Sequence, residues 1–517
     1  MTTPSTPAHG DLVLHDVLRA RSRSDPDRTA IIFENRNLTF ADLEQESNKL
    51  ANALREFGVE AGDRIGIYLP NCPEFEIGFY AASKLGAIVC PLNSSYRERE
   101  ITYQLNDAGV VVLLTHAKLW PIVSAARPHL KDLRAIVVVG GGAHASQPGV
   151  FNYRELLSGE SSDPPAGAVD PGRLVALPYS SGTTGFPKGV MLTHRNLVRN
   201  HEQYVQAMRL GPDDSYIIYL PLSHIYGVAL MGAAIKSGAK QIILERFDLE
   251  TVVRLVQEHG VTWLFTVPPI LLALANTPGL EASQFRTVKF AFTAAAPLAP
   301  DVARRVEARL GFRVIQGYGL TEASPATHNS PLDADRIKLE SGGVLLADTE
   351  HRIVDVETGE RTLAPGEVGE IVVRGPQVMQ GYWNAPEETA RALRGGWLYT
   401  GDTGWVDEEG YIYIVDRKKE MIKYKSFSVA PAELEAVLLE HPDVADCGVT
   451  GVPDDEAGEV PKAFVVARAG REIDLNSLAE FVAERVAGYK QIRHFEVIDL
   501  IPRTPSGKIL RRLLKER

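Results

Sequence analysis

Residues 179–190 contain the densest set of groups that could hold a polyphosphate. The segment reads Tyr-Ser-Ser-Gly-Thr-Thr-Gly-Phe-Pro-Lys-Gly-Val and consists mostly of Ser, Thr and Gly. Glycines let successive backbone N–H groups face one point, hydroxyls add donors, and Lys188 adds a cation. The spacing is not that of a Walker A loop, because Lys188 is followed by Gly189 rather than by Ser or Thr. We therefore predict a polyphosphate-binding loop of another type, with an ordinary flexible loop as the plainer alternative.

Four further segments hold residues that suit the same chemistry. Residues 316–325 (Gln-Gly-Tyr-Gly-Leu-Thr-Glu-Ala-Ser-Pro) follow a strand candidate, and α/β proteins bind ligands at the carboxyl ends of strands. Residues 399–404 place Asp402 between glycines, as an acidic ligand for ribose hydroxyls requires. Residues 502–511 present Lys508, a cation that could stabilise charge developing on a phosphate. Residues 220–227 present His224 among apolar neighbours.

Each of these four segments also has a plainer interpretation when it is taken alone. Gly-x-Gly is equally a tight turn, an Asp between glycines is more often a turn, and residues 502–517 are basic enough to be a solvated tail. A lone histidine between apolar residues is usually a core residue. The chemistry is favoured because all the segments occur in one chain.

The elements that must position these residues follow an alternating pattern from about residue 60. Short apolar strands that alternate with helical segments of ten or more residues are typical of α/β architecture with largely parallel sheets. Two such series follow one another, so we expect two sheets in one large body. The first series has strands at 64–69, 87–90, 110–114 and 135–139 and a helix at 73–85; the second has strands at 241–244, 261–265, 288–292 and 313–316 and helices at 248–259 and 300–310.

Short strands and glycine turns dominate residues 340–415, including a hairpin whose turn is Asp407–Gly410. The remainder predicts a compact α+β unit, with helices at 431–439 and 475–486 and strands at 446–452 and 462–466. We therefore expect a flexible tail over residues 1–10, a large N-terminal domain over 11–415 and a small C-terminal domain over 416–517.

Composition limits the classes of protein that fit. The chain has 517 residues, and its net charge of −11 argues against a coat for nucleic acid. Its three cysteines form neither a disulfide framework nor a zinc spacing. No apolar run reaches the length of a membrane span, and the N-terminus does not resemble a signal peptide. We expect a cytoplasmic protein without nucleic-acid or membrane partners.

Taken together, the five motifs resemble those of the adenylate-forming (ANL) superfamily, of the 4-coumarate-CoA ligase and fatty-acid-CoA ligase type, over roughly Thr39 to Lys508. The resemblance implies a large N-terminal domain, a small C-terminal domain that rotates between two half-reactions, and a hinge at Lys419. It implies catalytic roles for Lys508, His224, Thr184 and Glu322, of which Glu322 would also hold Mg²⁺. The implied nucleotide-binding residues are Ser180, Ser181, Gly182, Thr183, Thr184, Lys188, Ala295, Gln316, Gly317, Tyr318, Gly319, Thr321, Asp402, Ile414, Arg417 and Lys508. The implied acyl pocket comprises His224, Tyr226, Val267, Pro268, Thr293, Ala294 and Gly319, and the implied coenzyme A site comprises Lys423, Lys425, Ser426 and Phe427.

The activity that the resemblance implies is an acid:CoA ligase that uses ATP and Mg²⁺ and forms an acyl-adenylate. It leaves open a homodimer and a carrier protein as the acyl acceptor. The chain departs from the pattern at Ser426 and Ser428, where Gly and Gln are usual, and at Ala294 and Ala347, where Gly and Pro are common. These departures motivate one alternative, a relative specialised to a single half-reaction. A non-catalytic nucleotide-binding protein is a second alternative, and the retained polar residues argue against it.

Overall fold

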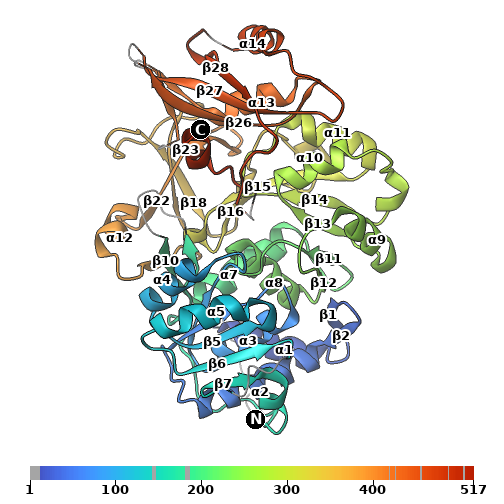
Figure 1. Cartoon of the computed structure of the whole chain (residues 1–517), viewed down its shortest axis with the longest axis vertical. Helices are drawn as coiled ribbons and strands as arrows, with labels where there is room; N and C mark the ends of the chain where they lie inside the picture. The colour runs from blue at the N-terminus through green and yellow to red at the C-terminus, as the bar shows by residue number, and fades with distance from the viewer. Residues whose placement is uncertain are drawn as a thin grey trace.

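The computed structural model describes residues 12–141, 147–180, 187–417, 420–424, 427–454, 457–486, 488–504 and 507–517, with only the backbone of Arg417, Phe427 and Ser428. Its strands form four sheets, with helices packed around the two larger ones (Figure 1). The first sheet lies at the lower end of the molecule in Figure 1, and the fourth sheet forms the upper end.

The first sheet has a parallel centre and an antiparallel edge. Its order is β20-β10-β8-β4-β3-β5-β6-β7, and β9 pairs with β10 outside this path. The pairs from β8 to β7 are parallel, whereas β10 is antiparallel to β8, β9 and β20. The strands are β3 (Arg64–Tyr68), β4 (Ile88–Pro91), β5 (Val110–His116), β6 (Ala135–Val139), β7 (Val150–Asn152), β8 (Leu174–Ala176), β9 (Tyr179–Ser180), β10 (Lys188–Thr193) and β20 (Gly381–Tyr382); the helices nearby in sequence are α3 (Pro73–Lys84), α4 (Glu98–Ala108), α5 (Trp120–Ala126), α6 (Tyr153–Leu157) and α7 (His194–Ala207).

The second sheet has the order β17-β16-β15-β14-β13-β11-β12-β1-β2. Its strands from β15 to β1 are parallel, and β2, β16 and β17 add antiparallel edges. The strands are β1 (Thr29–Phe33), β2 (Arg36–Thr39), β11 (Ser215–Ile218), β12 (Lys240–Ile243), β13 (Trp263–Thr266), β14 (Phe290–Thr293), β15 (Arg313–Gly319), β16 (Ala326–Asn329) and β17 (Val344–Leu345). The remaining helices of this body are α1 (Leu14–Ser24), α2 (Phe40–Glu56), α8 (Ile225–Ser237), α9 (Leu249–His259), α10 (Pro268–Asn276) and α11 (Pro300–Leu310).

The third and fourth sheets are smaller. The third has the order β18-β19-β22-β21, with β23 beside β22, and the fourth has the order β25-β24-β27-β26, with β28 beside β27. The third comprises β18 (Glu350–Val354), β19 (Gly369–Arg374), β21 (Leu393–Arg394), β22 (Trp397–Val406) and β23 (Ile412–Arg417), next to α12 (Pro386–Ala392). The fourth comprises β24 (Ile422–Tyr424), β25 (Phe427–Val429), β26 (Val444–Asp454), β27 (Gly458–Ala467) and β28 (His494–Val497), with α13 (Pro431–Leu439), α14 (Leu475–Ala483) and α15 (Arg511–Lys515).

The α/β class and the two successive series of strands are confirmed. The strand at 135–139 and the helices at 300–310 and 431–439 have the predicted bounds, and the Asp407 backbone N–H donates to the Tyr411 carbonyl across the predicted hairpin turn. Two predictions were wrong in extent. The helix predicted to reach residue 486 ends at Ala483. The strand predicted over 313–316 continues to Gly319, so the Gly-x-Gly segment is strand and not a turn.

The last strand of the third sheet ends at Arg417, and the fourth sheet begins at Ile422. The predicted domain boundary near Asp416 falls in this interval and stays a prediction, and the predicted hinge Lys419 lies outside the described residues. The predicted tail also lies outside them.

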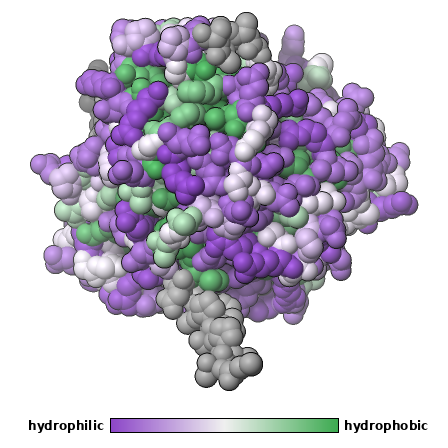
Figure 2. All heavy atoms as spheres, turned by 90° about the horizontal axis from the view of Figure 1, so that it is seen from below, coloured by the Kyte–Doolittle hydropathy of each residue, from purple (hydrophilic) through white to green (hydrophobic). Residues whose placement is uncertain are grey.

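The outer surface is largely polar at the end of the molecule that carries α2 and β7. Figure 2 shows hydrophilic side chains over most of this face, with apolar ones gathered in limited areas. Among the described residues, no helix combines the length and the apolar character that crossing a membrane requires.

One large apolar core joins the two larger sheets, and Glu76 is buried there without an ion pair among the described residues. Glu76 of α3 is fully buried and accepts a hydrogen bond from the Gln241 side-chain amide of β12 at 3.3 Å. Its other carboxylate oxygen has no hydrogen-bond partner among the described residues. Burial raises the pKa of Glu76 to about 8.

Replacing Glu76 with Gln is expected to stabilise the protein at neutral pH. Because its pKa is higher in the folded than in the unfolded state, the stabilising contribution of Glu76 is full below about pH 4.5 and is lost as the pH rises toward 8. The free energy of unfolding of Glu76→Gln should therefore exceed that of the parent by roughly 1–3 kcal/mol at pH 7.5 and by much less at pH 5. Urea unfolding at the two pH values measures this, and a gain that does not depend on pH would contradict it.

Candidate functional site

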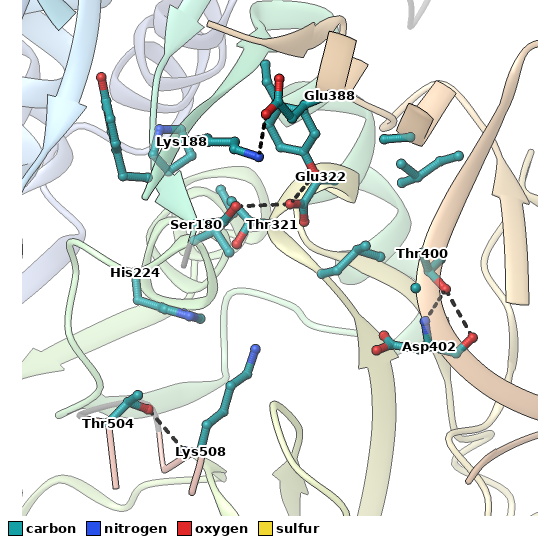
Figure 3. A pocket seen from close by; sticks show the side chains of 18 of the residues that line it. Ser180, Lys188, His224, Thr321, Glu322, Glu388, Thr400, Asp402, Thr504 and Lys508 are labelled. Carbon is teal, nitrogen blue, oxygen red and sulfur yellow. Dashed lines mark hydrogen bonds and ion pairs between the residues drawn. The ribbon is translucent and has the colours of Figure 1, made fainter. Parts of the chain in front are cut away.

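A cavity of about 530 Å³ lies where parts of the first, second and third sheets meet the loop before α15 (Figure 3). It is lined by residues from five separate stretches of sequence, which include Ser180 and Lys188, His224, Thr321 and Glu322, Asp402, and Lys508. The cavity therefore brings together at least one residue from each of the five segments that the sequence singled out.

A β-hairpin forms the end of the cavity that we predict to bind phosphate. Strands β9 and β10 pair antiparallel, with Ser180 opposite Lys188 and Tyr179 opposite Gly189. The residues between them, Ser181, Gly182, Thr183 and Thr184 among them, lie outside the described residues. Lys188 Nζ lies 3.1 Å from Glu388 Oε1 of α12, and this ammonium holds the pKa of Glu388 below its ordinary value. A cation thus faces the cavity at the end of the loop.

The Glu322 carboxylate joins the first sheet to the second at this end of the cavity. Glu322 lies in the single turn η5 (Thr321–Ala323) that follows β15. Its Oε1 accepts hydrogen bonds from the Ser180 hydroxyl at 3.1 Å and from the Tyr382 hydroxyl at 2.9 Å. Burial, followed by the Glu322 charge, raises the pKa of Tyr382, which keeps this hydroxyl a donor. Carboxylate and hydroxyl oxygens are the donor set that a hard cation such as Mg²⁺ prefers, so these residues fit that ion.

A second carboxylate marks the opposite end of the cavity. Asp402 lies in β22 and is 8% exposed, and its Oδ2 accepts a hydrogen bond from the Tyr318 hydroxyl at 2.8 Å. The Asp402 backbone N–H donates to Thr400 Oγ1 at 3.1 Å, which holds the strand locally (Figure 3). Arg417, which the resemblance also places at the ribose, is the β23 residue opposite Asp402.

His224 is present at the cavity as a neutral imidazole. It precedes α8, and its Nδ1 accepts the Tyr226 backbone N–H at 3.2 Å, so the ring proton is on Nε2. Burial and the nearby Lys508 ammonium lower the pKa of His224 to about 4. Figure 3 shows the ring directed toward the cavity. A neutral imidazole with Nε2–H can donate a hydrogen bond to a carboxylate or carbonyl oxygen.

Lys508 reaches the cavity from the part of the chain that carries the fourth sheet. The Lys508 backbone N–H donates to Thr504 Oγ1 at 3.1 Å, and the Thr504 N–H donates to the Lys508 carbonyl at 2.8 Å, which makes a tight loop. Arg503 ties this loop to Asp446 of β26 at 2.7 Å. Gly507 has φ +86° and approaches Val267 and Pro269 so closely that a Cβ would lie 3.3 Å from each.

Neighbouring atoms lie so close to positions 317 and 319 that only glycine fits there. A Cβ at Gly317 would lie 2.5 Å from the Phe292 ring, and one at Gly319 would lie 2.1 Å from the Pro325 carbonyl oxygen. Neither residue lines the cavity itself, and the Gln316 side chain donates to the Leu339 carbonyl. Their part in nucleotide binding stays a prediction.

Other predicted residues are not among those that line the cavity. Tyr226, Val267 and Thr293 are buried, and Pro268 begins α10. Ala294 and Ile414 are half-buried, and Ala295 has φ +74°, a conformation that a residue with a Cβ rarely adopts. Lys423 is exposed on β24, away from the cavity wall, whereas Lys425 and Ser426 lie outside the described residues and the Phe427 side chain is not described.

Sequence analysis missed two residues that complete the phosphate-binding end, Tyr382 and Glu388. Tyr382 also has its ring centre 5.9 Å from the Lys188 ammonium. The available signal was an aromatic pair, Tyr382 and Trp383, directly after Gly381 in a polar stretch.

Lys188 at one end of the cavity and the Asp402 carboxylate on β22 at the other suit a phosphorylated nucleoside. The fold and the site therefore define a nucleotide-binding enzyme. The sequence profile of the AMP-binding enzyme family matches residues 18–383, and that of the AMP-binding enzyme C-terminal domain matches residues 433–508. The chain belongs to the family of AMP-binding enzymes.

Relatives and solved structures match almost the whole chain. It is 41% identical to 4-coumarate--CoA ligase 3 of Oryza sativa subsp. japonica, over 93% of this chain and 87% of that protein. It is 38% identical to the 4-coumarate--CoA ligase of Pinus taeda, over 98% of this chain and 95% of that protein. An anthranilate CoA ligase in complex with anthranoyl-AMP superimposes with a TM-score of 0.92 at 26% identity, covering 100% of this chain and 98% of that one. ATP-bound MatB from Rhodopseudomonas palustris gives a TM-score of 0.89 at 28% identity, covering 98% and 99%.

Substitutions at the two ends of the cavity should affect the binding of AMP and ATP differently. Asp402→Asn is expected to weaken the binding of AMP and of ATP equally, by about 10-fold, because one charge-assisted acceptor at the nucleoside end is lost. Lys188→Ala is expected to weaken the binding of ATP by a similar factor of about 10 and to leave the binding of AMP unchanged, because AMP has no β- or γ-phosphate. Equilibrium titration of both nucleotides measures the split. Equal losses for AMP and ATP in Lys188→Ala would contradict the assignment of the ends.

Proposed function

We propose that this chain is an AMP-forming acid:CoA ligase that acts on an aromatic carboxylic acid of the arylacrylic type. The observation that carries the proposal is the meeting of Lys508, His224 and Glu322 at one cavity, although they come from three distant segments. The names of the relatives support the reaction class and point to an aromatic acid.

The residues account for the first half-reaction. A carboxylate oxygen attacks the α-phosphorus of ATP, the bond to the β-phosphate oxygen breaks, and pyrophosphate leaves. Such a transfer requires positioning and neutralisation of charge more than covalent help. Lys188 and the loop before it hold the β- and γ-phosphates, Lys508 stabilises the charge at the α-phosphate, and the Nε2–H of His224 orients the acid. Glu322 is the residue that would hold Mg²⁺, which supplies further neutralisation of phosphate charge.

The second half-reaction transfers the acyl group to coenzyme A. The thiol sulfur attacks the acyl carbon and AMP leaves, so the cavity must admit a thiol where Lys508 now stands. A mobile C-terminal domain, divided from the rest near Asp416, would provide this exchange. Lys423, Lys425, Ser426 and Phe427 are proposed for coenzyme A, and Ser181 to Thr184 for the phosphates.

The proposal is tested with a panel of acids that includes 4-coumarate, cinnamate, anthranilate, malonate and a long-chain fatty acid. Pyrophosphate and acyl-CoA are measured in the same reaction. Both products with 4-coumarate or cinnamate are expected. If both products form only with an aliphatic acid, the proposed substrate class is wrong. If pyrophosphate is released but no acyl-CoA forms, the alternative of an enzyme specialised to one half-reaction is favoured.

Lys508→Ala is expected to reduce adenylation strongly and to spare thioester formation. Removing one preorganised charge at the reacting phosphate typically costs about 100-fold or more in rate. Acyl-CoA formation from a supplied acyl-adenylate does not pass through that step and should remain within about threefold of the parent. Pyrophosphate release and thioester yield are the two readouts. Equal pyrophosphate release by variant and parent would remove Lys508 from catalysis.

A polar contact across the proposed domain division should favour adenylation. Arg468, which follows β27, donates to Asn276 Oδ1 at the end of α10 at 2.7 Å, and Arg305 donates to the same oxygen at 2.9 Å. Since Lys508 reaches the cavity in this arrangement, Arg468→Ala is expected to slow adenylation about 3- to 10-fold without slowing thioester formation from a supplied adenylate.

Arg471→Ala is the matched control for this contact, because Arg471 lies 3.7 Å from Asp443, in the same part of the chain. It should leave both half-reactions unchanged. A loss of both half-reactions in Arg468→Ala would show a general structural defect instead.

A further inference from the structure

Helix α4 (Glu98–Ala108) contacts the polyphosphate-binding loop at the point where the loop ends. The Tyr103 hydroxyl donates a hydrogen bond to the Pro187 carbonyl at 3.0 Å, directly before Lys188. A second cavity, of about 450 Å³, separates α4 from Pro187 and is lined by Tyr96, Arg99, Glu100, Tyr103, Gln104 and Pro187. Tyr103 lines this cavity, so its hydroxyl connects α4 to Pro187 across the edge of an open space and not within a filled core.

The same helix contacts the chain where the loop begins. The Tyr179 hydroxyl donates to Asp107 Oδ2 at 2.6 Å, and Tyr179 directly precedes Ser180. A hydroxyl that donates to a carboxylate over so short a distance is a charge-assisted bond, which is stronger than a neutral one. Asp107 and Tyr103 are four residues apart on α4, so their side chains project from one face of the helix.

Asp107 also connects α4 to the strand that carries Tyr382. Its backbone carbonyl, one of the last in the helix, accepts a hydrogen bond from the Trp383 indole N–H at 3.1 Å. Carbonyls at a helix C-terminus have no partner within the helix, so this acceptor is available to a neighbouring element. Trp383 follows Tyr382, whose hydroxyl donates to Glu322. Both ends of the loop and the strand beside Glu322 therefore take their position from one turn of α4.

Helix α4 is itself well fixed. Gln104 donates to the Pro91 carbonyl at 2.9 Å, and Arg64 of β3 donates to the Ala108 and Gly109 carbonyls at 2.6 and 2.7 Å. Ile101 and Leu105 are buried on the side that packs against the first sheet. A helix fixed in this way can hold the residues at the two ends of the loop in place.

We propose that Tyr103 and Asp107 are positioning residues that fix the two ends of the polyphosphate-binding loop and thereby set the affinity for the β- and γ-phosphates of ATP. The inference rests on the proposed function, because it needs ATP as the substrate. Neither residue touches the nucleotide in this account, and both act through the loop and through Lys188. Loss of either side chain should weaken the binding of ATP and leave the binding of AMP unchanged, because AMP lacks the β- and γ-phosphates.

The experiment titrates the full-length protein with Mg·ATP and, separately, with AMP. Tyr103→Phe removes one hydroxyl and is expected to raise the Kd for ATP about 3- to 10-fold. Asp107→Ala removes a charge-assisted acceptor and is expected to raise it about 5- to 20-fold. Asp107→Asn keeps an oxygen that can accept from Tyr179 and should recover most of the loss.

Asn106→Ala is the matched control on the same helix. Asn106 donates to the His129 carbonyl at 2.9 Å and accepts from the Lys131 N–H at 3.1 Å, so its loss disturbs α4 on a side away from the loop. Both nucleotides should bind this variant as they bind the parent. Thermal unfolding of every variant shows whether each one folds.

The outcomes distinguish this inference from the proposed function. A selective loss of ATP affinity in Tyr103→Phe and Asp107→Ala supports the inference. Unchanged ATP affinity, equal losses for ATP and AMP, or the same selective loss in Asn106→Ala would each overturn it while the proposed function stands. A parent protein that binds neither nucleotide would overturn the proposed function, and the inference with it.

Discussion

The Glu322 carboxylate is the interaction on which the cavity depends. It extends from the end of β15 in the second sheet and accepts hydrogen bonds from Ser180 and Tyr382, both of the first sheet. An acid so placed must be partnered, because an isolated charge in a partly buried position is costly. The two hydroxyls provide that partnership and bring the two sheets together at one point. The same carboxylate thus has a structural role and suits a divalent cation beside a phosphate.

Charged groups at the cavity have polar partners within the protein. Lys188 lies beside Glu388, and Asp402 accepts from Tyr318. Paired groups keep their orientation without a ligand, so less entropy is lost when a nucleotide arrives. A phosphate can then take over part of the contact that Glu388 makes with Lys188. The overall net charge of −11 is compatible with an anionic substrate because these local pairs decide the potential at the site.

The sequence predicted the α/β class, most strands of both large sheets and the five segments that meet at the cavity. Those features are local, since apolar runs, turn residues and glycines are visible within a short window. The sequence did not predict that β1 (Thr29–Phe33) pairs in parallel with β12, because that pairing joins residues about two hundred positions apart. It also missed Tyr382 and Glu388, whose roles arise only from what the fold places beside Lys188 and Glu322. The end of the second predicted helix in the C-terminal part was wrong because apolar periodicity alone does not fix where a helix stops.

The lining of the cavity comes from several sheets, and this division bears on the proposed mechanism. The first sheet holds Lys188, the third sheet holds Asp402, and the chain beyond the third sheet contributes Lys508. The backbone of Lys508 bonds to Thr504, and the neighbouring Arg503 bonds to Asp446 of β26, so Lys508 is tied to the fourth sheet. The contacts of this part of the chain with the large body include Gly507 against Val267, Arg468 against Asn276, and Leu439 of α13 against the main apolar core. The rotation of the C-terminal domain that we propose would withdraw Lys508 from the cavity, while the hydrogen bonds that join Glu322 to Ser180 and Tyr382 lie within the large body.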